Sequence, residues 1–418
     1  MSLQYIQRVG MLSRNARLYM VSTVLQGFSS GIWSVIFYLY LKLGEVGFRD
    51  DFIGNMFTVS ALATGFVALP AGLIIERLGT KKAMIISVTA NFINIVQIIV
   101  LQSSILLLAS LVAGLIGTIG WVASAPFMTE NSTREERTYL FSISWATMIV
   151  MGILGNLAGG FMPSIFNSYL GSASGAVSAF GYRLALLISV VLALVAAIPL
   201  LLMKQAKRKE RTMSEILSFK NIKSSKIMLK LALPVGLIGF GAGFIVPLLN
   251  LFFAGKFAAT TEEIGILNAL SNVTLVVGTL SAPVMSRKLG KVRAIALCEF
   301  LSMPFIMLMT LSPVLPLAGF AFITRNALMN MAGPVSGTFQ MEMVTETERA
   351  TTNGLLVTAD NIPRAITASV SGGMMASGDY FTPFLATTCS YLFASSLFYL
   401  FFRNAESQKP TSQASNAS

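Results

Sequence analysis

The segment Gly72-Leu-Ile-Ile-Glu76-Arg77-Leu-Gly79-Thr80-Lys81-Lys82 is a short charged stretch that separates two long apolar runs. The runs cover about residues 52–75 and 83–102, and each has the roughly 20 residues that a membrane-spanning helix needs. Gly79 predicts a tight turn between them, because glycine adopts backbone conformations that other residues avoid. The stretch therefore predicts two neighbouring spanning helices joined by a short charged loop.

The composition extends this prediction to the whole chain. Of its 418 residues, 54% are hydrophobic and only 11% are charged, and the mean hydropathy is +0.72. A soluble domain carries roughly 25% charged residues, so a soluble protein of this composition would lack a polar surface. The formal net charge of +12 comes from short basic clusters between apolar runs. No basic stripe is interleaved with aromatic residues, which argues against a nucleic-acid-binding protein.

Twelve apolar runs are long enough to span a membrane, and they predict an all-α membrane protein. The runs cover about residues 18–41, 52–75, 83–102, 105–128, 139–162, 182–203, 228–252, 263–285, 293–312, 314–339, 352–376 and 381–402. Their division predicts a cytoplasmic tail at 1–17, six helices in 18–203, a basic linker at 204–227, six helices in 228–403 and a disordered tail at 404–418.

The lysines and arginines predict how the chain is oriented in the membrane. With the N-terminus in the cytoplasm, the cytoplasmic segments carry 24 of the 30 lysines and arginines. The outer segments carry four, which are Lys42, Arg49, Arg183 and Lys256. Such a bias follows the positive-inside rule. We therefore expect both termini in the cytoplasm, and the protein in the plasma membrane of a prokaryote.

The two halves of the sequence contain an internal repeat. At an offset of 212 residues, four identities link the segments after the fourth and tenth spans: Glu130 with Glu342, Thr133 with Thr345, Glu136 with Glu348, and Arg137 with Arg349. Gly79 matches Gly290 at an offset of 211, and the fifth and eleventh spans both end in a Gly-Gly pair. These matches predict a duplicated six-helix unit, which is the plan of one large class of transporters.

Residues 72–82 resemble the signature that the major facilitator superfamily carries between its second and third spans, GxxxDRxGR(R/K). Here Glu76 stands in place of the aspartate and Thr80 in place of the first basic residue. The resemblance covers about residues 17–403. It implies two pseudo-symmetric six-helix bundles that rock about a central cavity, and a protein that is complete as a monomer.

The resemblance also implies that charged loops latch the cytoplasmic side when the protein faces outward. The predicted cytoplasmic gate comprises Gly72, Glu76, Arg77, Gly79, Lys81, Lys82, Glu130, Arg137, Glu342 and Arg349. The alternatives are charge that only sets the topology, for residues 72–82, and exposed loop charge for the two later acid–base pairs.

Charged residues inside the predicted spans are candidates for substrate binding or proton coupling, since charge at membrane depth is costly. Arg325 lies about halfway along span ten. Asp360 and Arg364 lie in span eleven, four residues apart, and therefore share a helix face. We predict an intramembrane ion pair of Asp360 with Arg325 or Arg364, with a static structural pair as the alternative. Glu299 lies in span nine, which the resemblance places at the periphery, so we expect it to be a packing residue.

Polar and aromatic residues on the presumed cavity helices are further candidates. The polar ones are Gln26 in span one, Asn250 at the end of span seven, and Asn326 and Asn330 in span ten. The aromatic set Phe28, Trp33, Phe37, Tyr38, Trp121 and Trp145 would suit a flat or lipophilic substrate, or would simply face lipid and neighbouring helices.

Three departures from the family weaken the interpretation as a proton-coupled drug antiporter. Asn156 replaces the proline of the antiporter signature GPxxGG, span one has no acidic residue, and span four has no arginine. The sequence therefore leaves two transport functions open. One is proton-coupled export of a lipophilic or amphiphilic compound, with Asp360 as the acid. The other is a carrier for a polar or anionic metabolite, which Arg325 and Arg364 would bind.

Other classes of function have less support. A non-transporting receptor would need a signalling domain that the sequence does not show. An enzyme is not expected, because there is no nucleophile–base set, no metal-ligand cluster and no Walker-type loop. The predicted partners are a small-molecule substrate, membrane lipid and protons as the coupling ion, with no nucleic acid, no metal and no cofactor.

Overall fold

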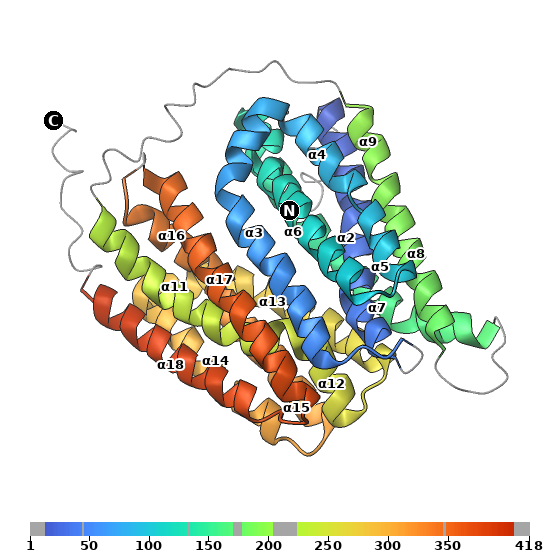
Figure 1. Ribbon diagram of the computed structural model, residues 1–418. Coiled ribbons are helices and arrows are strands. Elements are labelled where there is room, and N and C mark those ends of the chain that lie inside the picture. Colours follow the sequence, from blue (N-terminus) through green and yellow to red (C-terminus); the bar gives the residue numbers. More distant parts are fainter. Residues whose placement is uncertain are drawn as a thin grey trace.

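The computed structural model describes residues 13–43, 46–131, 134–169, 178–203, 224–345 and 348–404 (Figure 1). Most of the predicted tails and of the basic linker lie outside these ranges. Every regular element within them is a helix. The helices form two bundles of six spanning units each, as the sequence predicts.

The N-terminal half contains six spanning units, two of which are broken into two helices. The helices are α2 (Arg14–Lys42), α3 (Asp50–Leu78), α4 (Thr80–Thr89), α5 (Phe92–Ile99), α6 (Ser103–Glu130), α7 (Arg134–Tyr169), α8 (Ala179–Val195) and α9 (Ala197–Leu201). The third unit consists of α4 and α5, and the sixth of α8 and α9.

The C-terminal half repeats this plan. Its helices are α11 (Ser225–Ile245), η2 (Val246–Leu248), α12 (Leu249–Phe257), α13 (Thr261–Leu289), α14 (Lys291–Leu311), α15 (Leu315–Met331), α16 (Gly333–Glu342), α17 (Arg349–Ala376) and α18 (Thr382–Phe402). The seventh unit consists of α11, η2 and α12, and the tenth of α15 and α16. Each predicted apolar run therefore lies on the helix or broken helix expected for it.

Among the described residues, eight of these units are long and apolar enough to cross a membrane. Among the described residues, the other four are α3, α13, α17 and the broken unit α15–α16. They lie alongside the eight in the same two bundles, and α17 carries the charged residues singled out from the sequence.

The structure bears out the internal repeat at the level of single residues. Helices α3 and α13 are both 29 residues long and are offset by 211. Each ends at a glycine with the same unusual backbone, Gly79 with φ 83° and ψ 148°, and Gly290 with φ 85° and ψ 159°. This conformation is almost exclusive to glycine, so the turn that the sequence predicts at Gly79 occurs in both halves.

Closely packed glycines hold the first and fifth units of the N-terminal half together. A Cβ atom added to Gly31 would lie 2.5 Å from the carbonyl oxygen of Gly152 and 2.8 Å from the Cα atom of Gly155. The backbones of α2 and α7 therefore touch at this point. Such contacts between small residues are a principal means of packing helices in membranes.

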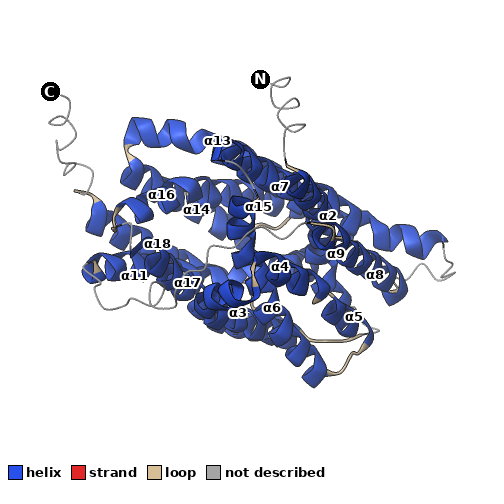
Figure 2. Cartoon of the chain, turned by 90° about the horizontal axis from the view of Figure 1, so that it is seen from above, coloured by secondary structure: helices blue, strands red, loops and turns tan. Residues whose placement is uncertain are grey.

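The two halves meet at the end of the molecule away from the termini. In Figure 1 their ribbons lie close together near α12 and diverge towards α4 and α16. Seen from above in Figure 2, α3 and α17 lie side by side between the two bundles, which agrees with their extensive contacts. A Cβ atom added to Gly54 of α3 would lie 2.8 Å from the carbonyl oxygen of Ala368 in α17.

Candidate functional site

Asp360 and Arg364 form an ion pair on α17. The Nη2 atom of Arg364 lies 2.8 Å from Oδ1 and 2.9 Å from Oδ2 of Asp360, and the Nε atom donates to Oδ2 at 3.2 Å. The side chains are 26% and 21% exposed. The i, i+4 spacing predicted from the sequence therefore brings the two charges together, and the partner of Asp360 is Arg364 rather than Arg325.

The pair lies on the side of α17 opposite its exposed apolar residues. Along an α-helix each residue advances by about 100°, and Asp360 and Arg364 then lie roughly opposite Leu355 and Ile366, which are apolar and exposed. The backbone of Asp360 packs closely on α11, since a Cβ atom added to Gly239 would lie 2.8 Å from the Cα atom of Asp360. The pair is therefore placed within the protein, beside α11, rather than on the exposed apolar side of α17.

An exposed aromatic pair lies on the N-terminal half. The rings of Trp121 in α6 and Trp145 in α7 are 5.9 Å apart, and both side chains are more than half exposed. On α7, Trp145 lies roughly opposite the exposed apolar residues Val150, Leu154 and Phe161. The two tryptophans thus form one apolar, polarisable surface.

Arg325 lies inside the C-terminal bundle and is only 3% exposed. Its Nη2 atom donates to the hydroxyl of Tyr391 in α18 at 2.8 Å, and the guanidinium lies 5.7 Å from the centre of the same ring. The Nε atom is buried without a hydrogen-bond partner. In this conformation the arginine is therefore not accessible to a solute, and it does not pair with Asp360.

Glu299 of α14 contacts the face of α18 that also carries Tyr391. Its Oε2 atom accepts a hydrogen bond of 2.6 Å from Ser395, which lies one turn after Tyr391. Sequence reasoning missed both of these hydroxyl partners because span twelve carries no charge. The spacing of four residues between them was the available signal, since it places both on one face.

The polar candidates make hydrogen bonds within and between helices. Gln26 donates to Ser22 at 2.8 Å, and Asn330 donates to the side-chain oxygen of Asn326 at 2.8 Å, so these two asparagines share a face as predicted. Asn326 itself donates to Ser271 in α13. Asn250 donates to the carbonyl oxygen of Ser34 at 2.9 Å, across the boundary between the halves.

The predicted gate residues have partners within their own halves. Thr80 donates to Glu130 at 2.6 Å, and Lys81 donates to the carbonyl oxygens of Leu201 and Met203 at 3.0 and 2.5 Å.

The second half repeats these contacts. Lys291 and Glu342 form an ion pair of 2.6 Å, and Arg349 donates to the carbonyl oxygen of Met341 at 3.1 Å. The pairs Thr80–Glu130 and Lys291–Glu342 occupy corresponding positions in the two halves of the internal repeat. The side chains of Glu76 and Arg137 lie outside the described set, Arg77 and Lys82 are exposed, and a Cβ atom added to Gly72 would meet open space.

Polar contacts join the halves at the opposite end. Thr58 of α3 donates to the carbonyl oxygen of Ala365 in α17 at 2.6 Å, and Ser369 donates to Asn55. Tyr182 of α8 and Thr261 of α13 share a hydrogen bond between their hydroxyls. The described conformation is therefore closed at this end, while Lys81, Glu130 and Glu342 have partners within their own halves.

Comparison with known proteins identifies the family. The sequence profile of the Major Facilitator Superfamily matches residues 19–238 and 231–417. The chain belongs to the Major Facilitator Superfamily. The resemblance seen in residues 72–82 is thus confirmed over nearly the whole length. No curated protein sequence matched the chain.

Solved structures of this superfamily share the fold. A bacterial homologue of the human lysosomal transporter Spinster, in an inward-facing and unoccupied conformation, is 15% identical with a TM-score of 0.75, over 95% of this chain and 98% of that one. A nucleoside transporter is 13% identical with a TM-score of 0.76, over 94% and 100%. A D-xylose–proton symporter is 13% identical with a TM-score of 0.73, over 93% and 97%. The family and the fold are those of multi-pass membrane transporters of small molecules.

Proposed function

We propose that this protein exports a lipophilic or amphiphilic compound by alternating access, with proton uptake and release at Asp360 as the coupling step. The observation that carries the proposal is the Asp360–Arg364 ion pair within span eleven, on α17. A charge pair at membrane depth is costly to maintain. When Asp360 gains a proton the pair loses its attraction, so the proton changes the charge of the interior.

The aromatic pair supports a lipophilic substrate. Trp121 and Trp145 offer exposed ring surface. Aromatic and apolar walls with a few polar groups are typical of sites for drug-sized molecules. A cationic amphiphile would compete with Arg364 for the ionised Asp360, and it would be released when Asp360 gains a proton.

The orientation completes the proposal. With the termini in the cytoplasm of a prokaryotic cell, the strong excess of lysine and arginine lies on the inner side. The described conformation then opens towards the cytoplasm, and its local contacts at Glu130 and Glu342 belong to an unlatched cytoplasmic gate. In the opposite conformation residues 72–82 would latch against the other half. The protein would act as a monomer in the plasma membrane.

An accumulation experiment in cells tests this function. Ethidium accumulation is measured in an efflux-deficient bacterial host that produces wild type, Asp360→Asn or the control Asp51→Asn. Asp51 is an exposed acid at the end away from the termini. We expect wild type and the control to lower ethidium accumulation, and we expect a protonophore added to the cells to abolish this effect. Asp360→Asn should not lower accumulation, although it is produced at the normal level. If wild type and the empty host accumulate equally across a panel of lipophilic cations, the export function is wrong.

A carrier for a polar or anionic metabolite is the second candidate. Arg364 donates to both oxygens of Asp360, and a carboxylate or phosphate of a solute would replace Asp360 as its partner. Arg325 would contribute only after leaving its buried contact with Tyr391. Uptake of labelled organic anions that is lost in Arg364→Gln and retained in Asp360→Asn would favour this function over export.

A further inference from the structure

A cavity separate from the charged helix lies at the end away from the termini, where the two halves meet. It encloses about 650 Å³, which falls in the range of sites that hold drug-sized ligands. We call it the seam cavity. Its lining residues are Leu39, Lys42, Leu43, Pro163, Ser164, Asn167, Ser168, Tyr182, Ala254, Ala258, Ala259, Thr260, Thr261 and Glu262.

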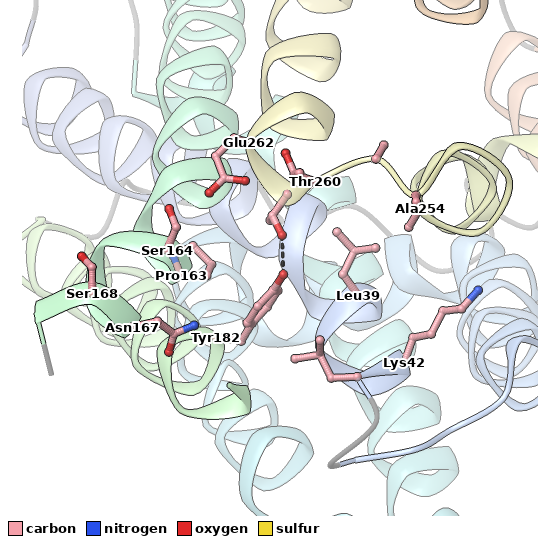
Figure 3. Close-up of a pocket in the computed structure, with 14 residues that line it drawn as sticks. Leu39, Lys42, Pro163, Ser164, Asn167, Ser168, Tyr182, Ala254, Thr260 and Glu262 are labelled. Carbon is pink, nitrogen blue, oxygen red and sulfur yellow. Dashed lines mark hydrogen bonds between the residues drawn. The ribbon is translucent and has the colours of Figure 1, made fainter. Parts of the chain in front are cut away.

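Both halves build the seam cavity. The N-terminal half supplies α2, the end of α7 and the start of α8, and the C-terminal half supplies α12 and the first turn of α13. The hydrogen bond between Tyr182 and Thr261 crosses from one half to the other at its wall (Figure 3). Because the walls come from both bundles, the cavity has this shape only while the halves are together at this end.

Of the two charged residues that line the seam cavity, Lys42 has a counter-ion and Glu262 does not among the described residues. Lys42 has its own counter-ion, since its Nζ atom lies 2.8 Å from Asp50, and Figure 3 shows its side chain extending away from Glu262. Among the described residues no lysine or arginine pairs with Glu262. Residues 170–177, which follow α7 in the sequence, contain neither lysine nor arginine. The side chains of Ser164 and Thr260 hydrogen-bond to Glu262. The cavity therefore holds one carboxylate that has neutral partners and no counter-ion among the described residues.

The remaining polar groups already have partners. Asn167 accepts from the backbone of Gly181 at 3.1 Å, Ser168 donates to the carbonyl oxygen of Ile165 at 2.9 Å, and Thr260 caps α13. The other walls are mostly alanine, leucine and proline. A ligand that matches this surface has an apolar body and one positive group, placed at Glu262.

We propose that the seam cavity is a second ligand site, which binds a monovalent organic cation with an apolar body and holds the protein in the described conformation. The ammonium or iminium group of the ligand pairs with Glu262, and its body lies against the apolar walls. A ligand that contacts both halves stabilises the conformation in which they meet, because it binds that conformation better than the separated one. The proposal requires no transport and stands independently of the proposed export function.

Binding to the purified full-length protein tests the proposal. The probe is rhodamine 6G, a monovalent lipophilic cation, whose fluorescence anisotropy is titrated with protein in detergent and with empty micelles as the blank. The variants are Glu262→Gln, which removes the charge with little change of shape, and Ser168→Trp, which fills the cavity from an exposed position. The matched control is Asp51→Asn, an acid at the same end outside the cavity.

We expect Glu262→Gln to raise the Kd about tenfold, as the loss of one charge-assisted contact does. Ser168→Trp should abolish saturable binding, and Asp51→Asn should leave the Kd unchanged. Nile red, an uncharged probe of similar size, should bind wild type and Glu262→Gln equally. Saturable binding that is unchanged in both Glu262→Gln and Ser168→Trp would overturn the proposal. A further variant, Asp360→Asn, separates this cavity from the charged helix. Binding that is lost only in Asp360→Asn would also overturn the proposal, because the cation would then bind beside α17.

Discussion

The close contact between α3 and α17 predicts opposite effects of substituting the adjacent residues Gly372 and Gly373. A Cβ atom added to Gly372 would lie 2.7 Å from the carbonyl oxygen of Asp50 and 3.2 Å from the Cα atoms of Asp51 and Gly54. All of these are backbone atoms, which cannot rotate away. A Cβ atom added to Gly373, the next residue, would meet open space. We therefore expect Gly372→Val to push the two halves apart at this end, and Gly373→Val to leave them together.

The size of the effect follows from the cost of overpacking. Inserting methyl groups into a tightly packed contact costs about 1–3 kcal/mol. Gly372→Val pays this cost only in the described conformation, because the helices separate in the opposite one. An energy of that size changes the ratio of two conformations by roughly 5- to 150-fold. Both valine variants gain the same helix propensity over glycine, so this contribution cancels in the comparison.

Distances between spin labels measure the change. Labels are attached to cysteines at Arg49 in the N-terminal half and Phe381 in the C-terminal half, both exposed at the end away from the termini. The native Cys298 and Cys389 are replaced by alanine. We expect one short distance in the background protein and in Gly373→Val, and a second, longer distance in Gly372→Val, measured by pulsed electron resonance in nanodiscs.

Two results would refute the reasoning. If Gly372→Val folds and gives the same distance distribution as the background, the close contact of α3 and α17 does not control the conformation. If both valine variants lengthen the distance equally, the cause is a general effect of valine in α17 rather than the contact with Asp50.

Three further predictions concern stability and are read from thermal unfolding in detergent. Gly79→Ala and Gly290→Ala should each lower the free energy of unfolding by about 1–3 kcal/mol, because both glycines hold a backbone conformation that alanine avoids. Clearly unequal losses would contradict the structural repeat. Tyr391→Phe should lower the free energy of unfolding by about 1–3 kcal/mol, because the buried Arg325 loses its hydrogen bond. Adding Arg325→Met should recover much of that stability. If the effects of the two substitutions are additive, the contact does not stabilise the protein. Glu342→Gln removes one partner of an exposed ion pair and should change stability by at most about 1 kcal/mol, so a larger loss would show that the pair is not exposed.

The candidate site was only partly predictable from the sequence. The spacing of Asp360 and Arg364 predicts their shared face, and the structure confirms that they form an ion pair. The partner of Arg325 was not predictable, because Tyr391 lies 66 residues further along the chain and in a helix without charge. Local spacing determines contacts within one helix, whereas the choice between two neighbouring helices depends on how the bundle packs.

The sequence by itself determined the helices, their number and their pairing into two related halves. Apolar runs of about 20 residues exclude other structures in lipid, since every backbone polar group must be satisfied within the segment. The offset between Gly79 and Gly290 likewise follows from the sequence and appears in the backbone.

Only the tertiary structure decided which end of the molecule is closed and which residues the halves share. The sequence marks Gly372 and Gly373 as equals, yet one contacts α3 and the other meets open space. The seam cavity and the position of Glu262 in it have no signature in the sequence either. These features arise from contacts between segments far apart in the sequence, such as Tyr182 and Thr261, which are 79 residues apart. Such contacts form in one conformation of the two bundles and separate in another, while the sequence is the same in both.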